Sequence, residues 1–168
     1  MKKTVKKNNV LRVYNLLNAA KLGAIEENDE KFKIILILRE LKTVANGLEE
    51  FRKDAVEKLK PEGYDDKILA WNECSEKLQL GVKPEKLPMS AEEFVDTTYK
   101  IIKPFNTALN DLIEKEAEKE VELEFEPISE ESVMKLGVAH DWNVGQIDMI
   151  SGLVCETESA KPEGEKKS

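Results

Sequence analysis

The sequence predicts a mainly α protein: an elongated helical bundle with one long central helix and a minor β element near the C-terminus. Three observations lead to this fold class. Apolar residues recur every three or four positions along most of the 168 residues, which is the spacing of one helix face. That spacing runs unbroken over residues 29–60. At residues 120–126 it changes to strict alternation, as in a strand with one buried face.

The first expected helix covers residues 9–22, and Gly23 follows it as a stop signal. Its apolar residues are Val10, Val13, Leu17 and Ala20.

The second expected helix is the longest and covers residues 29–60. Asn28 or Asp29 can cap its start, and Pro61 with Gly63 ends it. Such a helix is about 48 Å long, whereas a compact domain of this chain length is about 40 Å across. We therefore expect an elongated molecule.

Two features inside the long helix carry further expectations. Residues 34–38 are apolar on every side, so we expect this part to be buried all round. Five consecutive aliphatic residues also fit a strand, but the unbroken periodicity favours a helix. Gly47 costs about 1 kcal/mol relative to alanine in a helix, which indicates the close approach of another element.

A third helix is expected over residues 65–80, ending at Gly81, followed by an extended connection. The next helix starts at Ser90, because Ser90 and Glu93 have the spacing of a capping box.

Its helical pattern continues across Pro104. Proline removes one backbone hydrogen bond and clashes with the preceding turn. We expect either a kink near Lys100 or two helices that meet at residues 103 and 104.

Residues 120–126 are expected to form a half-buried strand, with Val121, Leu123 and Phe125 on one face and glutamates on the other. Pro127 ends this strand.

Two short helices follow, one starting near Ser129 and one at Asn143, where Gln146 completes a second capping-box spacing. We expect a single domain over residues 1–155. A disordered tail is expected over residues 156–168, because almost no apolar residue occurs there.

A single strand needs a partner for its backbone. One candidate is the basic segment 2–7, which would set lysines opposite the glutamates. A second is the segment 153–155, and a third is a strand of another subunit or a target protein. The apolar face of Val121, Leu123 and Phe125 is accordingly a candidate interaction site.

Charge is concentrated in two segments. Residues 111–131 hold ten acidic residues against two lysines, which equals the net charge of −8 of the whole chain. The N-terminal arm carries Lys2, Lys3, Lys6 and Lys7, which are candidate interaction residues. The arm could contact phosphates, remain solvated, or neutralise the acidic segment. Nucleic acid is the less favoured partner, because no aromatic residue is interleaved with the lysines.

The glutamate row is spaced too widely along a strand to converge on one metal ion. We expect like-charge repulsion to raise some of the pKa values in this row.

The sequence offers little catalytic chemistry. His140 is the only histidine, and it has no motif partners, so it is interpreted as a polar loop residue. Cys74 and Cys155 are far apart and fit neither a disulfide framework nor a zinc site. We expect no enzyme activity, no cofactor and no metal. Trp142 is a candidate interaction residue, and Trp71 a core residue.

No apolar run approaches the length of about 18 residues that a membrane span needs, so no membrane partner is expected. Reduced cysteines and the lack of a signal sequence favour the cytoplasm.

Three segments together resemble small helical phage and prophage proteins of uncharacterised role. They are VYNLLNAAKL, LRELKTVANGLEEFRKDAVEKL, and FNTALNDLIEKE with the following VELEFEPIS. The likeness spans most of residues 9–153, and residues 63–90 look like an insertion relative to shorter members. It implies a viral or mobile-element protein that acts by binding in the cytoplasm of a bacterial host, and it assigns no catalytic residue.

The expected function is therefore that of a non-enzymatic interaction or assembly module. It self-associates through the long helix or the strand, with a viral or host protein as a further partner. One alternative is a phage counter-defence protein that binds a small molecule such as a nucleotide. Another is a nucleic-acid-binding regulator that uses the basic arm.

Overall fold

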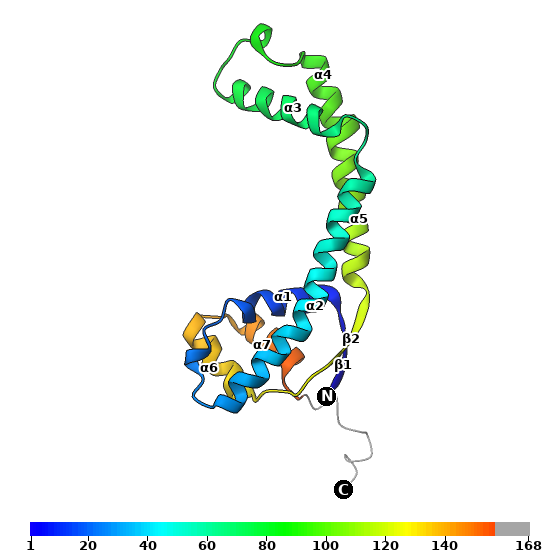
Figure 1. Cartoon of the computed structure of the whole chain (residues 1–168). Helices are drawn as coiled ribbons and strands as arrows, with labels where there is room; N and C mark the ends of the chain where they lie inside the picture. The colour runs from blue at the N-terminus through cyan, green and yellow to red at the C-terminus, as the bar shows by residue number, and fades with distance from the viewer. Residues whose placement is uncertain (157–168) are drawn as a thin grey trace. The chain divides into compact units, whose positions relative to one another are not determined.

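A computed structural model describes residues 1–156 of the chain, and the expected tail from residue 157 on lies outside them. The fold is mainly α with a small antiparallel sheet of two strands, which confirms the predicted fold class (Figure 1). The longest helix, α2, spans Asn28–Leu59 and matches the predicted 29–60.

The chain forms two compact units, whereas the sequence predicted one domain over residues 1–155. The first unit comprises residues 1–49 together with the segment from Glu116 onward, and the second comprises residues 50–115. Helical periodicity cannot reveal these boundaries, because both lie inside continuous helices.

The first unit holds the sheet, three α-helices and a 3₁₀ turn around the N-terminal part of α2. Its further elements are β1 (Lys2–Lys6), α1 (Lys7–Asn18), the 3₁₀ turn η1 (Leu22–Ala24), β2 (Glu120–Glu124), α6 (Glu130–His140) and α7 (Val144–Val154). They enclose one core in which the largest fully buried side chains are Leu17, Ile25, Ile34, Ile37, Leu41, Leu123, Leu136 and Ile150.

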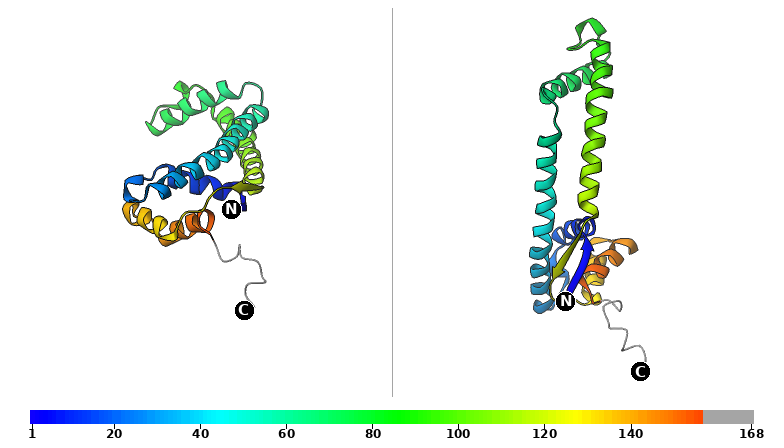
Figure 2. Two further views of the ribbon diagram at one scale, coloured as in Figure 1. Left: turned by 60° about the horizontal axis from the view of Figure 1, so that its bottom comes forward. Right: turned by 90° about the vertical axis from the view of Figure 1, so that its right-hand side faces the viewer.

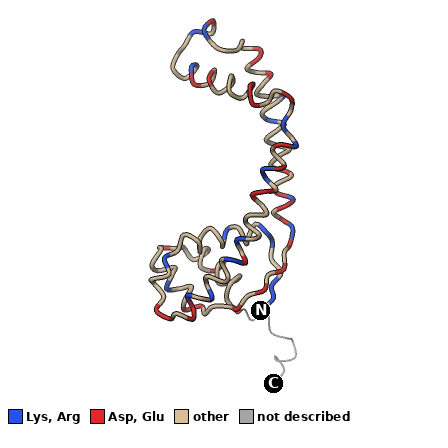
Figure 3. Tube along the Cα trace, in the orientation of Figure 1, with Lys and Arg blue, Asp and Glu red and all other residues tan. Residues whose placement is uncertain are grey.

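Strand β2 confirms the expected strand at 120–126 except for its last two residues, and its partner is the basic N-terminal segment (Figure 2). The pairing is antiparallel, with Lys2 opposite Glu124, Thr4 opposite Glu122 and Lys6 opposite Glu120. Figure 3 shows the basic strand beside the acidic one. Of the three candidate partners, the segment 2–7 therefore forms the ladder within the chain.

The second candidate partner also makes a contact. Ile128, just beyond β2, forms a parallel bridge with Cys155, and the Ile128 amide donates to the Val154 carbonyl at 3.0 Å. On the inner face of β1, the Lys3 ammonium donates to the carbonyls of Gly152 and Leu153. A cation at these carbonyls stabilises the C-terminal end of α7.

Helix α1 ends at Asn18 rather than at the predicted residue 22. The Lys21 amide donates to Nε2 of His140 at 2.8 Å instead of to a helix carbonyl. Gly23 lies inside η1 and does not terminate the helix. A contact with a residue far along the chain thus ends the helix earlier than local spacing predicted.

Two expectations for α2 are wrong. Residues 34–38 are not buried all round, because Ile35 and Leu36 are 37% and 39% exposed. Nothing lies within 4 Å of a Cβ placed on Gly47, so no element approaches there. The close approach occurs at Gly137 of α6, where such a Cβ would lie 2.8 Å from Cδ1 of Ile147 in α7.

The second unit is a set of helices that begins with the C-terminal part of α2. Its further elements are α3 (Tyr64–Gln79), the 3₁₀ turn η2 (Pro84–Lys86), α4 (Ala91–Asp96), the π-helical segment η3 (Thr97–Ile102) and α5 (Lys103–Glu118), the end of which belongs to the first unit. Helix α3 matches the predicted 65–80, and Gly81 follows with a left-handed backbone (φ 76°).

Pro104 is accommodated by the π-helical segment, and the structure has no pair of separate helices at this point. The Lys103 amide donates to the Thr98 carbonyl, five residues back, in place of the usual four. A proline ring clashes with the carbonyl four residues before it, here that of Lys100. The wider turn moves that carbonyl aside, and the helical backbone continues.

Of the two predicted capping boxes, the one at Ser90 forms in part and the one at Asn143 forms completely. Ser90 accepts from the Glu93 amide at 3.1 Å, but the reciprocal bond from Glu93 is not formed. Asn143 and Gln146 form the complete capping box at 2.8 and 2.9 Å.

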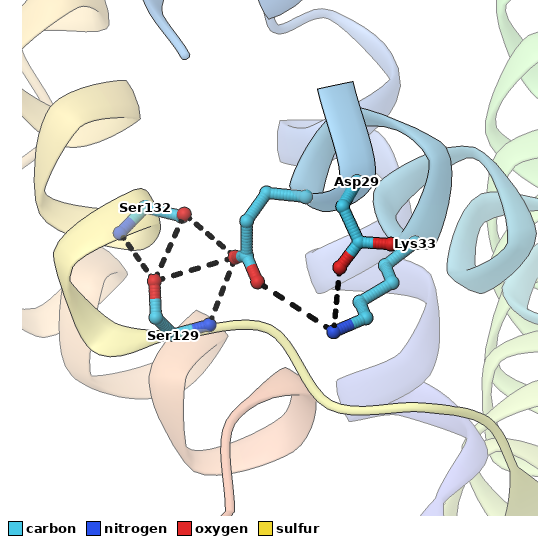
Figure 4. A network of polar contacts seen from close by, with 5 residues as sticks. Asp29, Lys33, Ser129 and Ser132 are labelled. Carbon is cyan, nitrogen blue, oxygen red and sulfur yellow. Dashed lines mark hydrogen bonds and ion pairs between the residues drawn. The ribbon is translucent and has the colours of Figure 1, made fainter. Parts of the chain in front are cut away.

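A carboxylate on α2 fixes the start of α6 (Figure 4). Glu30 accepts hydrogen bonds from the Ser132 hydroxyl at 2.7 Å and from the Ser129 amide at 3.0 Å, and Lys33 lies 3.9 Å away. Burial alone would raise the pKa of Glu30, but these hydrogen bonds outweigh it, so the pKa lies below its ordinary value. An anion at this position also complements the α6 dipole.

We expect Glu30→Ala to lower the free energy of unfolding by about 2 kcal/mol at neutral pH, because the buried Ser132 hydroxyl and the Ser129 amide lose a charged acceptor. A carboxyl whose pKa is depressed by folding stabilises the native state above its unfolded pKa, and this contribution is lost as the pH falls through the folded pKa. The difference between wild type and variant should therefore shrink below pH 4.5, the ordinary glutamate value. Urea unfolding at a series of pH values measures it; a pH-independent difference would contradict this account.

Candidate functional site

The three apolar residues predicted for the strand lie inside the first unit, Val121 and Leu123 in β2 and Phe125 directly after it. Leu123 is 1% exposed, Phe125 is 8% exposed, and Val121 is half-buried against the same core. These three predicted site residues pack against their own chain, so they present no free apolar face to a partner.

The lysines of the N-terminal arm face acceptors of their own chain. Lys2 lies 3.8 Å from Glu122, Lys6 lies 2.7 Å from Glu118, and Lys7 lies 2.7 Å from Glu116. Together with Lys3 at the α7 carbonyls, all four predicted residues have acceptors within the first unit. Of the three roles considered for the arm, this geometry favours neutralisation of the acidic segment.

Glu116 of α5, which precedes the glutamate row in the chain, has a lowered pKa. Hydrogen bonds from the ammonium groups of Lys119 and Lys7 hold its pKa below the ordinary value. Its side chain is 13% exposed and that of Lys7 is 26% exposed, so this ion pair is much less solvated than that of Lys2 and Glu122. The positive charges of Lys119 and of Lys7, the first residue of α1, favour the ionised form of Glu116.

Trp142 is half-buried between α6 and α7. Its ring stacks on His140 with centroids 5.9 Å apart. His140 is the last residue of α6, not a loop residue, and its Nε2 accepts from the Lys21 amide, so this ring has a structural role.

The two thiols are inaccessible. Cys74 and Cys155 are each 1% exposed, and burial raises the pKa of Cys155 to about 11. A thiol with such a pKa is a poor nucleophile at neutral pH. Within residues 1–156, no three acidic, histidine or cysteine side chains lie together in a way that could hold a metal ion.

The most conspicuous exposed apolar surface lies on the outer face of α2, at residues that were not among the predicted site residues. We define this face by Phe32, Ile35, Leu36 and Arg39, which have the spacing of one helix face. Phe32 is 59% exposed, and Ile35 and Leu36 are 37% and 39% exposed. The available signal was the run 34–38, which is apolar on all sides, whereas the core covers only one side.

A smaller apolar hollow lies on α6. Met134 and Val138 are 48% and 78% exposed, and with Ala24 they line a hollow of about 410 Å³. Glu131 and Lys135 flank it and form an ion pair at 3.5 Å.

Comparison of the chain with known proteins finds no matching family model, no matching curated protein and no matching solved structure. None of the helices within residues 1–156 has both the length and the apolar character needed to cross a lipid bilayer.

The ion pairs of the arm should differ sharply in their contributions to stability. We expect Lys7→Ala to lower the free energy of unfolding by about 1–2 kcal/mol, because it removes a half-buried charged partner of Glu116. Lys2→Ala is the matched control and should change it by less than about 0.5 kcal/mol, since its ion pair is solvated. Chemical denaturation of the two variants tests this, and equal losses would show that burial of the pair is unimportant.

Proposed function

We propose that this chain is a non-enzymatic interaction and assembly module of a phage or mobile element, acting in the cytoplasm of a bacterial host. It self-associates through the outer face of α2. The observation that carries the proposal is the exposure of Phe32, Ile35 and Leu36 on a helix whose opposite side is fully buried. Contiguous apolar side chains on a protein surface mark interaction sites.

The composition of the outer face favours a protein partner. Aromatic residues and arginine are enriched at protein interfaces, and this face presents both, in Phe32 and Arg39. Arg39 is exposed, and no ion pair links it to another side chain within residues 1–156. An apolar centre flanked by an unpaired cation therefore lies open to a partner.

A second copy of the chain fits this face. In an antiparallel pair of α2 helices with Ile35 opposite Leu36 of the partner, Phe32 lies opposite Arg39 of the partner, since both are the same number of residues from the centre. Two-fold symmetry forms this pair twice. An arginine over a phenylalanine ring is a cation–π contact, and opposed helix dipoles attract.

The double variant Phe32→Ser/Leu36→Ser tests the proposal through the mass of the protein in solution. We expect the wild type to be a dimer at micromolar concentration and the variant to be a monomer, because the apolar centre of the interface is lost. Val138→Ser is the matched control, as it removes an exposed apolar side chain elsewhere and should leave the dimer intact. If sedimentation shows that the wild type is a monomer at about 100 μM, the proposal is overturned, because this concentration is far above the micromolar dissociation constant expected for the dimer.

Cysteine cross-linking tests the antiparallel register. Ile35→Cys lies next to the two-fold axis and should form an intermolecular disulfide under mild oxidation. Arg39→Cys should not, because its two copies are about 10 Å apart along the helix axis. The native cysteines are buried and are the same in both variants, so any cross-linking through them contributes equally to the two measurements. Equal cross-linking at both positions would indicate parallel packing and contradict the register.

A further inference from the structure

A cavity in the second unit is independent of the outer face of α2. It lies between α3 and the continuous helix formed by α4 and η3, and has a volume of about 460 Å³. This volume falls within the range of about 300–1,000 Å³ that is typical of small-molecule sites. Its apolar lining consists of Ala70, Pro88, Met89 and Ile101.

The π-helical segment η3 shapes one wall of the cavity. Thr97, Lys100 and Ile101 line the cavity, and all three belong to η3. π-helical turns occur frequently at functional sites. Here the turn also accommodates Pro104, so it has a structural cause, and its effect is to set these side chains along the cavity.

The wall is held in place by contacts on the neighbouring face of the helix. Trp71 of α3 stacks on Phe94 with centroids 5.4 Å apart, and its indole N–H donates to the Thr98 hydroxyl at 2.8 Å. That hydroxyl in turn donates to the Phe94 carbonyl at 2.8 Å. A cavity beside such a network is largely preformed, which lowers the cost of binding a ligand.

Thr97 supplies a hydroxyl group at the cavity. It is only 6% exposed and lines the cavity. A hydroxyl can both donate and accept a hydrogen bond, so it suits either kind of polar group on a ligand.

The charges around the cavity determine the kind of ligand. Lys100 is paired with Asp96 at 3.3 Å. Of the other charged lining residues, Asp66 and Glu93 are acidic and Lys67 is basic. Glu93 is not engaged in a reciprocal cap at Ser90, so its carboxylate is available. The lining has a net charge of −1, which favours a cation and disfavours the phosphates of a nucleotide.

We propose that this cavity binds a small organic cation: an amine carried on an aromatic or branched aliphatic body. The apolar body packs against Met89 and Ile101, and the ammonium group pairs with the carboxylates of Asp66 and Glu93. Thr97 accepts or donates a hydrogen bond at the polar end of the ligand. Methionine suits such a site because its flexible side chain adapts to ligands of different shape.

Fluorescence of Trp71 tests the proposal. In the Trp142→Phe background Trp71 is the only tryptophan, so its emission reports on the second unit alone. The probe is 2-phenylethylamine, and 2-phenylethanol is its neutral match. We expect the amine to bind about tenfold more tightly than the alcohol, and Glu93→Gln to remove that preference. Glu92→Gln, which changes a neighbouring carboxylate outside the cavity lining, should leave it unchanged.

Several results would overturn the proposal. They are equal affinity for the amine and the alcohol, an unchanged preference in Glu93→Gln, and competition by ATP at the same site. Absence of binding at millimolar amine, checked by calorimetry, would do so as well. Because the cavity and the outer face of α2 lie in different units, the mass of the protein in solution distinguishes failure of this proposal from failure of self-association.

Discussion

The antiparallel pairing of β1 with β2 is the constraint on which the first unit depends. It joins Lys2–Lys6 to Glu120–Glu124, two segments from distant parts of the chain, and sets lysines opposite glutamates along one face. A sheet of two strands is marginally stable by itself. Here its inner face carries Leu123 into the core and Lys3 to the end of α7, so the ladder and the helices stabilise one another.

This pairing also determines which surfaces remain available. The basic arm faces glutamates of its own chain, and the apolar residues of β2 are covered by the core. One apolar surface that the first unit leaves uncovered is the outer face of α2, opposite the buried Ile34, Ile37 and Leu41. A helix that is apolar on all sides but covered on one offers a partner the most favourable burial in this unit.

The notable feature of the second unit is a cavity, not an exposed apolar face. Its cavity lies beside a helix that widens at η3 to pass Pro104, and the contact of Trp71 with Thr98 steadies that wall. The segment that accommodates this proline also carries Thr97, Lys100 and Ile101, which line the cavity. The face that we propose for a second copy and the cavity that we propose for an organic cation lie in different units of the chain.

Local periodicity by itself predicted the main helices and the strand that contains Val121 and Leu123, because these depend on neighbours within a few residues. The sequence named the basic segment 2–7 as one of three candidate partners for that strand, and the structure decided among them. Tertiary structure alone decided where α1 ends, that Ile35 and Leu36 stay exposed, and that the chain divides into two units. These outcomes depend on contacts such as His140 with Lys21, and on how much apolar surface the rest of the fold can cover. The cavity likewise could not be predicted, since it arises where α3 meets η3, and only the folded chain brings Asp66 and Thr97 to one hollow.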